Sequence, residues 1–219
     1  MHNSMGFSFG TVLNTLSSIY LGEDLPAPLA YADVINFNAS KKSESLTYWK
    51  SQLNGSPSPT WSLNSSAPTT YSPEDRLVIE RTIAMPQVQT EGVLPATLFH
   101  AACTLVLGAH YSEQEMIFGR LVTGRSMLPT ILQVVVSPIL TEVPLRVRLK
   151  GDNTVQSLSG KLQDRFIEDS KHEASGMVEI IRYSTEWAAE CEDFGWRTSF
   201  QQGDETDFSF LGEASKFAF

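Results

Sequence analysis

The sequence predicts an α+β fold, a two-layer sandwich in which a mixed β-sheet is covered by helices. Segments with the period of amphipathic helices intermix with short strand-like segments, without the strict strand–helix–strand order of a parallel sheet. Of the 219 residues, 42% are hydrophobic and 19% are charged, as in ordinary globular domains. No repeat is visible at solenoid periods, and the length suits one folding unit.

Helices are predicted where apolar residues recur every three or four positions. Gly22 is a stop signal after the first helix, Pro95 suits the first turn of an almost wholly apolar core helix, and Asp152 and Asn153 are expected to cap the fourth. A proline-bearing connector and a segment at 31–37 separate the first two helices. The predicted helices lie at residues 9–21, 43–53, 95–110, 154–170 and 178–183.

Strands are predicted where short apolar or alternating runs are bounded by turn residues. Pro144 lies inside one of them, and proline cannot donate to a ladder, so an edge or bulge position is expected there. A long surface loop rich in Ser, Pro and Thr is expected at 56–72. The predicted strands lie at residues 76–83, 116–122, 140–149 and 196–201.

Charge and composition exclude several classes of function. The net charge of −9 argues against a nucleic-acid partner, because binding to phosphate backbones needs clustered Lys and Arg. Cys103 and Cys191 fit neither a zinc motif nor a disulfide framework. No signal peptide and no apolar run of membrane-spanning length is present, so a soluble cytoplasmic protein without a membrane partner is expected.

Several segments match, in order and spacing, the motifs of one known family. One segment reads EMIFGRLVTGR, and the next reads SPILTEVPLRV. The first resembles a family strand and turn written with FG and SGR, and the second resembles G-P-x-x-N-T-x-P-x-R-V. Three further segments, at residues 31–33, 48–53 and 172–187, resemble the patterns Y-x-D, Y-W-x-x-x-L and the fungal-type H-E pattern of the same family. The family is the condensation domain of nonribosomal peptide synthetases. The matching segments are residues 31–33, 48–53, 115–125, 137–147 and 172–187.

This resemblance implies a chloramphenicol acetyltransferase-like half-domain. Residues 1–219 would be the C-terminal subdomain of a condensation domain whose N-terminal subdomain is missing. The complete domain joins acyl or aminoacyl thioesters by forming an amide bond. Its substrates are tethered by phosphopantetheine to peptidyl or acyl carrier proteins, and no cofactor binds the domain directly. Carrier proteins and the missing half-domain are therefore the expected partners.

The catalytic signature implied by the family is H-H-x-x-x-D-G-x-S, and it should fall at this N-terminus. Aligning Gly6 and Ser8 with G-x-S places Met1 on the second histidine and Met5 on the aspartate. His2, the candidate catalytic residue, stands one position out of register. Thr141 and Glu142 also replace the Asn-Thr pair of the later motif. The chain alone is therefore expected to be inactive, and a noncatalytic interaction module is the alternative.

A second alternative is a serine esterase. Residues 6–10 read G-x-S-x-G, the nucleophile elbow of α/β-hydrolases, but only five residues precede them, whereas the elbow needs a core strand there. Ser8 is therefore interpreted as the N-cap of the first helix.

The remaining histidines and two arginines have structural interpretations. His100 and Cys103, three residues apart on a helix, are expected to be a hydrogen-bonded core histidine and a buried thiol. His110 would cap the end of that helix. His172-Glu173 lacks the second histidine of a zinc motif, so no metal is expected. Arg120 and Arg125 are expected to form structural ion pairs.

Overall fold

The structure is a computed structural model of the 219-residue chain. It describes residues 3–25, 27, 29–59, 78–82, 92–187, 191, 194–201, 208–210 and 213–215. The helices are α1 (Asn3–Leu21), α2 (Tyr31–Leu53), α3 (Pro95–Tyr111), α4 (Thr130–Gln133), α5 (Val155–Asp169), the 3-10 turn η3 (Ser170–His172) and α6 (Met177–Ser184). The strands are β1 (Glu115–Val122), β2 (Thr141–Arg148), β3 (Arg197–Thr198), β4 (Phe208–Phe210) and β5 (Glu213–Ser215).

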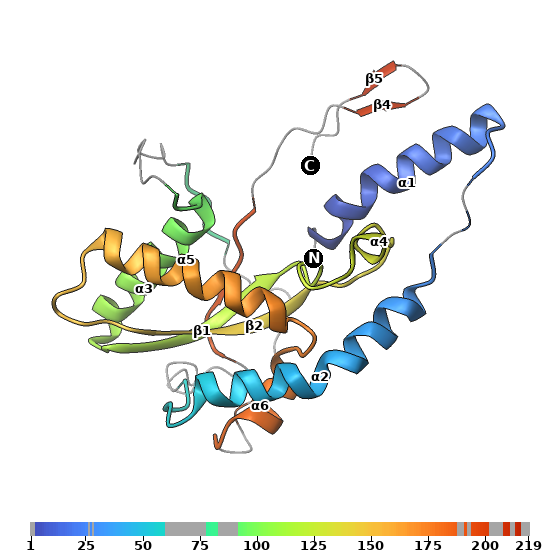
Figure 1. Ribbon diagram of the computed structural model, residues 1–219. Coiled ribbons are helices and arrows are strands. Elements are labelled where there is room, and N and C mark those ends of the chain that lie inside the picture. The colour runs from blue at the N-terminus through green and yellow to red at the C-terminus, as the bar shows by residue number, and fades with distance from the viewer. Residues whose placement is uncertain are drawn as a thin grey trace.

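The central sheet is mixed, as predicted. β1 lies in the middle, with β2 antiparallel on one side and β3 parallel on the other, as Figure 1 shows. Pro144 lies on β2, opposite Gly119 of β1. In the described sheet β2 is an edge strand, so the missing N–H of proline is tolerated there. The two strands predicted at 116–122 and 140–149 thus form and pair with each other.

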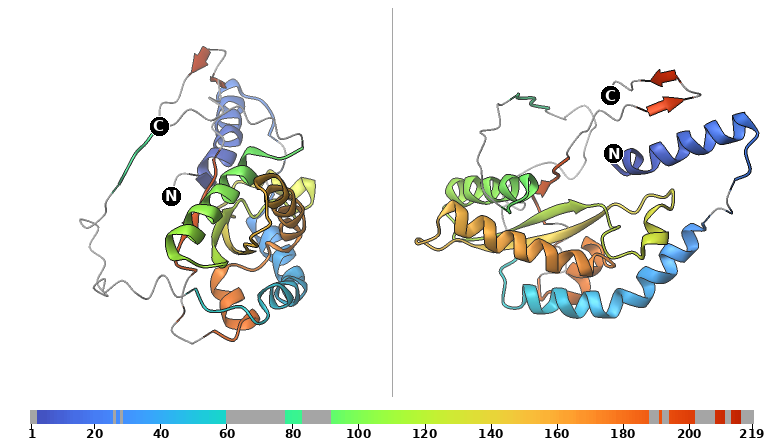
Figure 2. Two further views of the ribbon diagram at one scale, coloured as in Figure 1. Left: turned by 90° about the vertical axis from the view of Figure 1, so that its left-hand side faces the viewer. Right: turned by 45° about the horizontal axis from the view of Figure 1, so that its top comes forward.

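Helices cover both faces of this sheet (Figures 1 and 2). On one face, α3 and α5 pack against Met116, Phe118 and Leu145, all of which are fully buried. On the other face, α2 and α6 enclose a second core that contains Trp49 and Ile180. Each fully buried apolar side chain of this size contributes about 1.5–3 kcal/mol through the hydrophobic effect. The two cores hold the sheet between two pairs of helices, and the predicted α+β class is confirmed.

A third apolar cluster joins the first half of α2 to the segment that connects β1 with β2. Val34 is buried there against Leu128, Val135 and Ile139. This cluster fixes one side of the loop at residues 126–139, which also carries α4. None of the helices in the described part of the chain has both the length and the apolar character that a membrane crossing needs.

Several element boundaries differ from the prediction. The segment at 31–37 and the helix expected at 43–53 form one continuous helix, α2, because the polar residues between them include no Gly or Pro that would interrupt it. Of the strand expected at 76–83, the described part, residues 78–82, forms no strand, and the remaining positions lie outside the described residues. Val78 and Ile79 are both exposed, so their alternation marks no buried face. The strand expected at 196–201 is reduced to β3.

The N-cap of α5 is Thr154 rather than Asp152 or Asn153. The Thr154 hydroxyl accepts a hydrogen bond from the Ser157 backbone N–H at 3.1 Å, and the Ser157 hydroxyl accepts one from the Thr154 N–H at 3.0 Å. This reciprocal capping box satisfies two donors at once, which a cap one or two residues earlier would not do.

Candidate functional site

The predicted catalytic residue, His2, lies outside the described residues. The backbone that follows it is helical from Asn3, so Ser8 lies inside α1 and is not its N-cap. The prediction failed because the helix extends six residues further toward the N-terminus than the apolar pattern of 9–21 indicated. Residues 6–10 are therefore helical, whereas a nucleophile elbow requires a sharp turn between a strand and a helix.

α1 presents a row of apolar side chains to solvent. Its described contacts include the β4–β5 hairpin, and the two elements lie together beyond one side of the sheet, as Figures 1 and 2 show. Val12, Leu16, Ile19 and Tyr20 are between 44% and 73% exposed, which is unusual for apolar residues at helical spacing. Over residues 10–21, where burial is described, the helix that follows the candidate catalytic position is thus largely unburied.

The turn at the end of β1 is tightly built. Gly124 has φ +65°, and a side chain there would collide with the carbonyl oxygen of Ile139, so glycine is required. The next residue, Arg125, points its guanidinium at the loop that follows. Its Nη1 donates to the carbonyls of Gln133 and Val135 at 2.6 and 3.0 Å, and its Nη2 donates to that of Ser137 at 3.1 Å. One side chain therefore fixes the path of the loop at 126–139.

Arg120, five residues earlier on β1, anchors a buried ionic cluster. Its Nη2 lies 3.5 Å from Oδ2 of Asp169, and its guanidinium stacks over the Phe166 ring, 4.1 Å from the centroid. Burial lowers the pKa of Arg120, and the carboxylates of Asp169 and Glu173 oppose that shift. The predicted structural ion pair of Arg120 is confirmed, and the partner is the last residue of α5.

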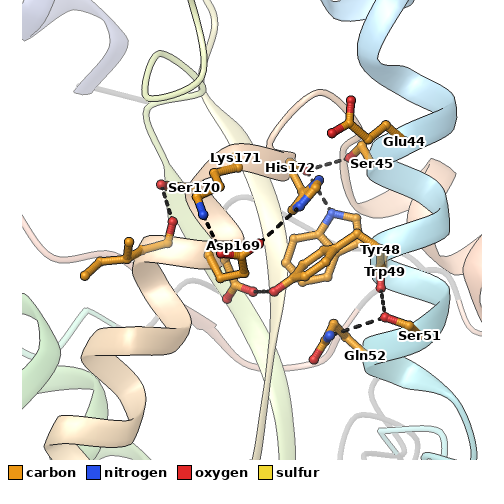
Figure 3. Close-up of polar contacts among 12 residues, drawn as sticks. Glu44, Ser45, Tyr48, Trp49, Ser51, Gln52, Asp169, Ser170, Lys171 and His172 are labelled. Atoms are coloured by element: carbon orange, nitrogen blue, oxygen red, sulfur yellow. Dashed lines mark hydrogen bonds and ion pairs between the residues drawn. The ribbon is translucent and has the colours of Figure 1, made fainter.

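Asp169 is fully buried and has two further partners, which Figure 3 shows in part. Its Oδ1 accepts hydrogen bonds from the Tyr48 hydroxyl and from Nε of Arg165, both at 2.7 Å. Burial, followed by the charge of Asp169, raises the pKa of Tyr48, so the phenol stays protonated and donates. This carboxylate therefore links α2, α5 and the central strand.

His172 and Glu173, the pair expected not to bind metal, both lie against this cluster. The His172 ring stacks on Tyr48 at 3.9 Å between centroids, and its backbone carbonyl accepts hydrogen bonds from Ser45 and from the Trp49 indole (Figure 3). Burial lowers the pKa of His172 and raises that of Glu173 to about 7. Among the described residues, no three His, Cys, Asp or Glu side chains gather as metal ligands would.

Three motifs that are far apart in the sequence converge at the carboxyl end of β1. Ser126, two residues after the Gly124 turn, acts on the Glu173 carboxyl and favours its ionised form. Arg125 reaches Ser137 at the start of the next motif. A side chain at Gly176 would approach the Thr141 hydroxyl to 3.0 Å, so the third motif packs closely against β2. The candidate site is therefore this junction, in which charged and polar groups hold backbone segments in place.

Glu142, one of the residues that replace the family's Asn-Thr pair, spans the sheet. Its Oε2 lies 2.9 Å from Nε of Arg197 on β3, although β1 lies between the two strands. Its side chain passes over Gly119, where a Cβ would stand 2.8 Å from the Glu142 Cδ. The glycine of the FG motif thus leaves the space through which this ion pair forms.

The other candidate residues have structural surroundings. His100 is buried, and its Nδ1 lies 2.6 Å from the Ala96 carbonyl, as expected for a hydrogen-bonded core histidine. Cys103 is half-buried rather than fully buried, and this burial raises the pKa of its thiol. His110 lies in the last turn of α3, which ends at Ser112 in a left-handed conformation.

Sequence reasoning missed Asp169, Tyr48 and the Glu142–Arg197 pair. Arg165 and Asp169 stand four residues apart on a predicted helix, a spacing that favours an ion pair and was an available signal. The pairing of Tyr48 with Asp169 joins α2 to α5 across 121 residues of sequence and left no local signal.

Comparison with known proteins agrees with the motifs. A family model described as Condensation domain matches residues 5–210. Cyclosporin synthetase simA from Tolypocladium inflatum is 28% identical over 198 residues, which make up 90% of this chain and 1% of that protein. Nonribosomal peptide synthetase 4 from Gibberella zeae is 31% identical over 193 residues, which make up 83% of this chain and 2% of that protein. The chain thus spans a small part of these relatives.

Solved structures share the fold. A crystal structure described as CT aligns with a TM-score of 0.75 at 24% identity, covering 97% of this chain and 48% of that one. The starter condensation domain of rhizomide synthetase aligns with a TM-score of 0.61 at 14% identity, covering 94% of this chain and 48% of that one. The chain spans about half of each, and the expected chloramphenicol acetyltransferase-like architecture is confirmed. Together, the family match and the converging motifs show that this chain belongs to the condensation domain family of nonribosomal peptide synthetases.

Proposed function

We propose that this chain is the C-terminal half of a condensation domain whose complete form joins carrier-bound acyl or aminoacyl thioesters through an amide bond. The observation that carries this proposal is the family match over residues 5–210, together with the alignment to about half of each solved condensation domain. The relatives are synthetases, so the partners are peptidyl or acyl carrier proteins that present phosphopantetheine-tethered substrates, and the compartment is the cytoplasm. The remaining partner is the N-terminal half-domain.

The reaction sets clear requirements on the site. The acceptor amine must reach the thioester carbonyl unprotonated and in near-attack geometry, inside a space that excludes water. A neutral imidazole suits the removal of the amine proton, because its ordinary pKa lies near neutrality. In this chain the residue nearest that place in the family signature is His2, and Met5 occupies the position of the aspartate that orders the catalytic loop.

We infer that the chain by itself does not catalyse amide formation. A thioether cannot supply the buried carboxylate that the signature places at Met5, and general-base catalysis contributes its 10²–10⁴-fold, in order of magnitude, only when the base lies within hydrogen-bond reach of the proton. The role of the chain is then to supply one wall of the site. The junction of Arg125, Glu173 and Ser137 is the part of that wall in which the family motifs meet.

The proposal is tested by measuring amide formation from donor and acceptor aminoacyl carrier proteins by mass spectrometry. The chain alone is expected to give no product. The chain combined with an N-terminal condensation half-domain that carries the intact histidine motif is expected to form product above the level of that half alone. If the combination gives no gain, the chain is the noncatalytic alternative, an interaction module, and the proposal fails.

Two variants sharpen the test. The chain by itself is expected to be inactive, and the His2→Ala variant by itself is expected to be equally inactive. The inferred inactivity would be refuted if the chain by itself formed product and His2→Ala abolished that product. Ester hydrolysis measured on the same samples addresses the serine esterase, for which Ser8→Ala would abolish turnover. Reading the coding sequence immediately upstream of the Met1 codon tests the half-domain assignment directly, because an in-frame histidine motif and a further domain are expected there.

A further inference from the structure

A cleft of about 620 Å³ lies between the carboxyl ends of α2 and α6. The two helices pack against each other, as Figure 1 shows. One wall consists of Lys50 and residues 53–58, at the end of α2 and in the loop after it, and the other consists of residues 183–187. The volume falls within the range of clefts that bind small molecules, which is roughly 300–1,000 Å³. The cleft lies apart from the junction at the carboxyl end of β1, whose residues do not line it.

Hydrogen bonds hold the two walls of this cleft in place. The indole N–H of Trp187 donates to the Ser56 carbonyl at 3.2 Å and joins the loop after α6 to the loop after α2. The Ser184 hydroxyl donates to the Leu46 carbonyl at 3.0 Å and joins the two helices. Nη1 of Arg146 donates to two carbonyls at the end of α2, at 2.9 and 3.0 Å. The walls are therefore set before a ligand binds, which lowers the entropic cost of binding.

Two charged side chains of opposite sign line the cleft. Lys50 on α2 and Glu186 after α6 are both exposed, and neither forms an ion pair with the other or with any other described residue. Earlier on α2, Lys42 does pair with Glu179 of α6, so a lysine between these helices pairs where a carboxylate is within reach. A cation and an anion that share a cleft without pairing are complementary to a ligand that carries both charges.

The remaining lining residues select the uncharged part of the ligand. Trp187 and Tyr183 contribute aromatic rings, and Leu53 and Pro57 add apolar surface. Aromatic rings pack favourably against other rings and contribute large apolar contacts. The carboxyl end of α6 also lies at the cleft, and its partial negative charge adds to that of Glu186 in favouring a cation. A complementary ligand therefore combines an ammonium group, a carboxylate and an apolar ring.

We propose that the cleft between the ends of α2 and α6 binds a zwitterionic α-amino acid with an aromatic side chain. Lys50 binds the α-carboxylate, Glu186 binds the α-ammonium group, and the ring of the ligand lies against Trp187. Both charged groups are solvated, so a ligand of this size is expected to bind with a Kd on the order of 1 mM. This inference does not depend on amide formation.

Saturation-transfer NMR on the 219-residue chain tests the proposal, because it observes the probe and does not require a monomeric protein. The probes are L-phenylalanine, 3-phenylpropanoate, which lacks the ammonium group, and 2-phenylethylamine, which lacks the carboxylate. The titrations use about 0.15 M salt, which screens the net negative charge of the chain. L-Phenylalanine is expected to bind about threefold to tenfold more tightly than either of the other probes. Equal binding of all three would overturn the proposal without any variant.

Two variants that each remove one charge locate the site. Lys50→Gln is expected to weaken L-phenylalanine binding by about threefold to tenfold and to leave 2-phenylethylamine binding unchanged. Glu186→Gln is expected to weaken L-phenylalanine binding similarly and to leave 3-phenylpropanoate binding unchanged. Both side chains are exposed, so both variants are expected to fold.

The matched control is Lys41→Gln, which removes a lysine of α2 that pairs with Glu44 and does not line the cleft. It is expected to bind all three probes as the wild type does. The proposal is wrong if either Lys50→Gln or Glu186→Gln binds L-phenylalanine as tightly as the wild type. It is also wrong if Lys41→Gln weakens that binding as much as they do.

Discussion

Replacing Gly119 with alanine puts a methyl group where the Glu142 side chain crosses the sheet. The added Cβ would stand 2.8 Å from the Glu142 Cδ and still closer to Oε1, so the carboxylate has to swing away. The Arg197 side chain is half-exposed, so the lost ion pair costs about 0.2–1 kcal/mol after screening. Crowding in a closely packed region adds about 1–3 kcal/mol. We expect Gly119→Ala to lower the free energy of unfolding by about 2 kcal/mol.

The matched background is Glu142→Ala, in which the space above Gly119 is vacated. Gly119→Ala is expected there to cost less than about 0.5 kcal/mol, because alanine at a compatible backbone conformation also restricts the unfolded chain. The coupling energy between the two positions is then about 1.5–2 kcal/mol. Urea unfolding of the four proteins, followed by circular dichroism, measures it. Equal destabilisation by Gly119→Ala in both backgrounds would refute the argument that glycine is needed at position 119 because the Glu142 side chain passes over it.

The remaining predictions concern the buried cluster, a helix cap and the apolar surface. Asp169→Asn is expected to cost about 3–5 kcal/mol, because it leaves the buried Arg120 without its anion, and urea unfolding measures this loss. Thr154→Ala is expected to lower the free energy of unfolding by about 1 kcal/mol through loss of the capping box. Gly160→Ala on the same helix, where an added Cβ meets no atom within 4 Å, is expected to raise it by about 0.5–1 kcal/mol. A thermal melt of each variant compares the two. The purified chain is expected to self-associate through apolar side chains such as those of α1, and light scattering after size exclusion checks this; a monomer that binds no hydrophobic dye would contradict it.

Sequence patterns predicted the parts of the fold that depend on local periodicity. The α3 helix and the paired strands β1 and β2 follow from apolar runs and from Pro144, and all three lie close to where the sequence placed them. Boundaries failed where a polar stretch remained helical, as in the middle of α2, or where alternation had no partner strand, as at residues 78–82. Periodicity reports which face is buried but does not report whether a neighbour exists to bury it.

The candidate site was predictable only in part, for a related reason. Arg120 could be expected to need an anion, because a charged side chain inside a strand of the core is rarely unpaired. Its partner, Asp169, lies on another element, and the contribution of Tyr48 comes from a third. Each of these contacts depends on how helices pack, which no local pattern encodes. The catalytic prediction at His2 lies outside the described residues and stays a prediction.

The hydrogen bonds from Arg125 to the loop at residues 126–139 have a consequence for which positions of that loop can be substituted. Its guanidinium donates hydrogen bonds to the backbone carbonyls of residues 133, 135 and 137, and a carbonyl is the same whatever side chain its residue carries. Substitutions at the exposed positions Ile131, Val134 and Val136 would therefore change what the loop presents without removing the bonds that shape it. The side chains that this loop exposes can thus change while the hydrogen bonds from Arg125 preserve its path.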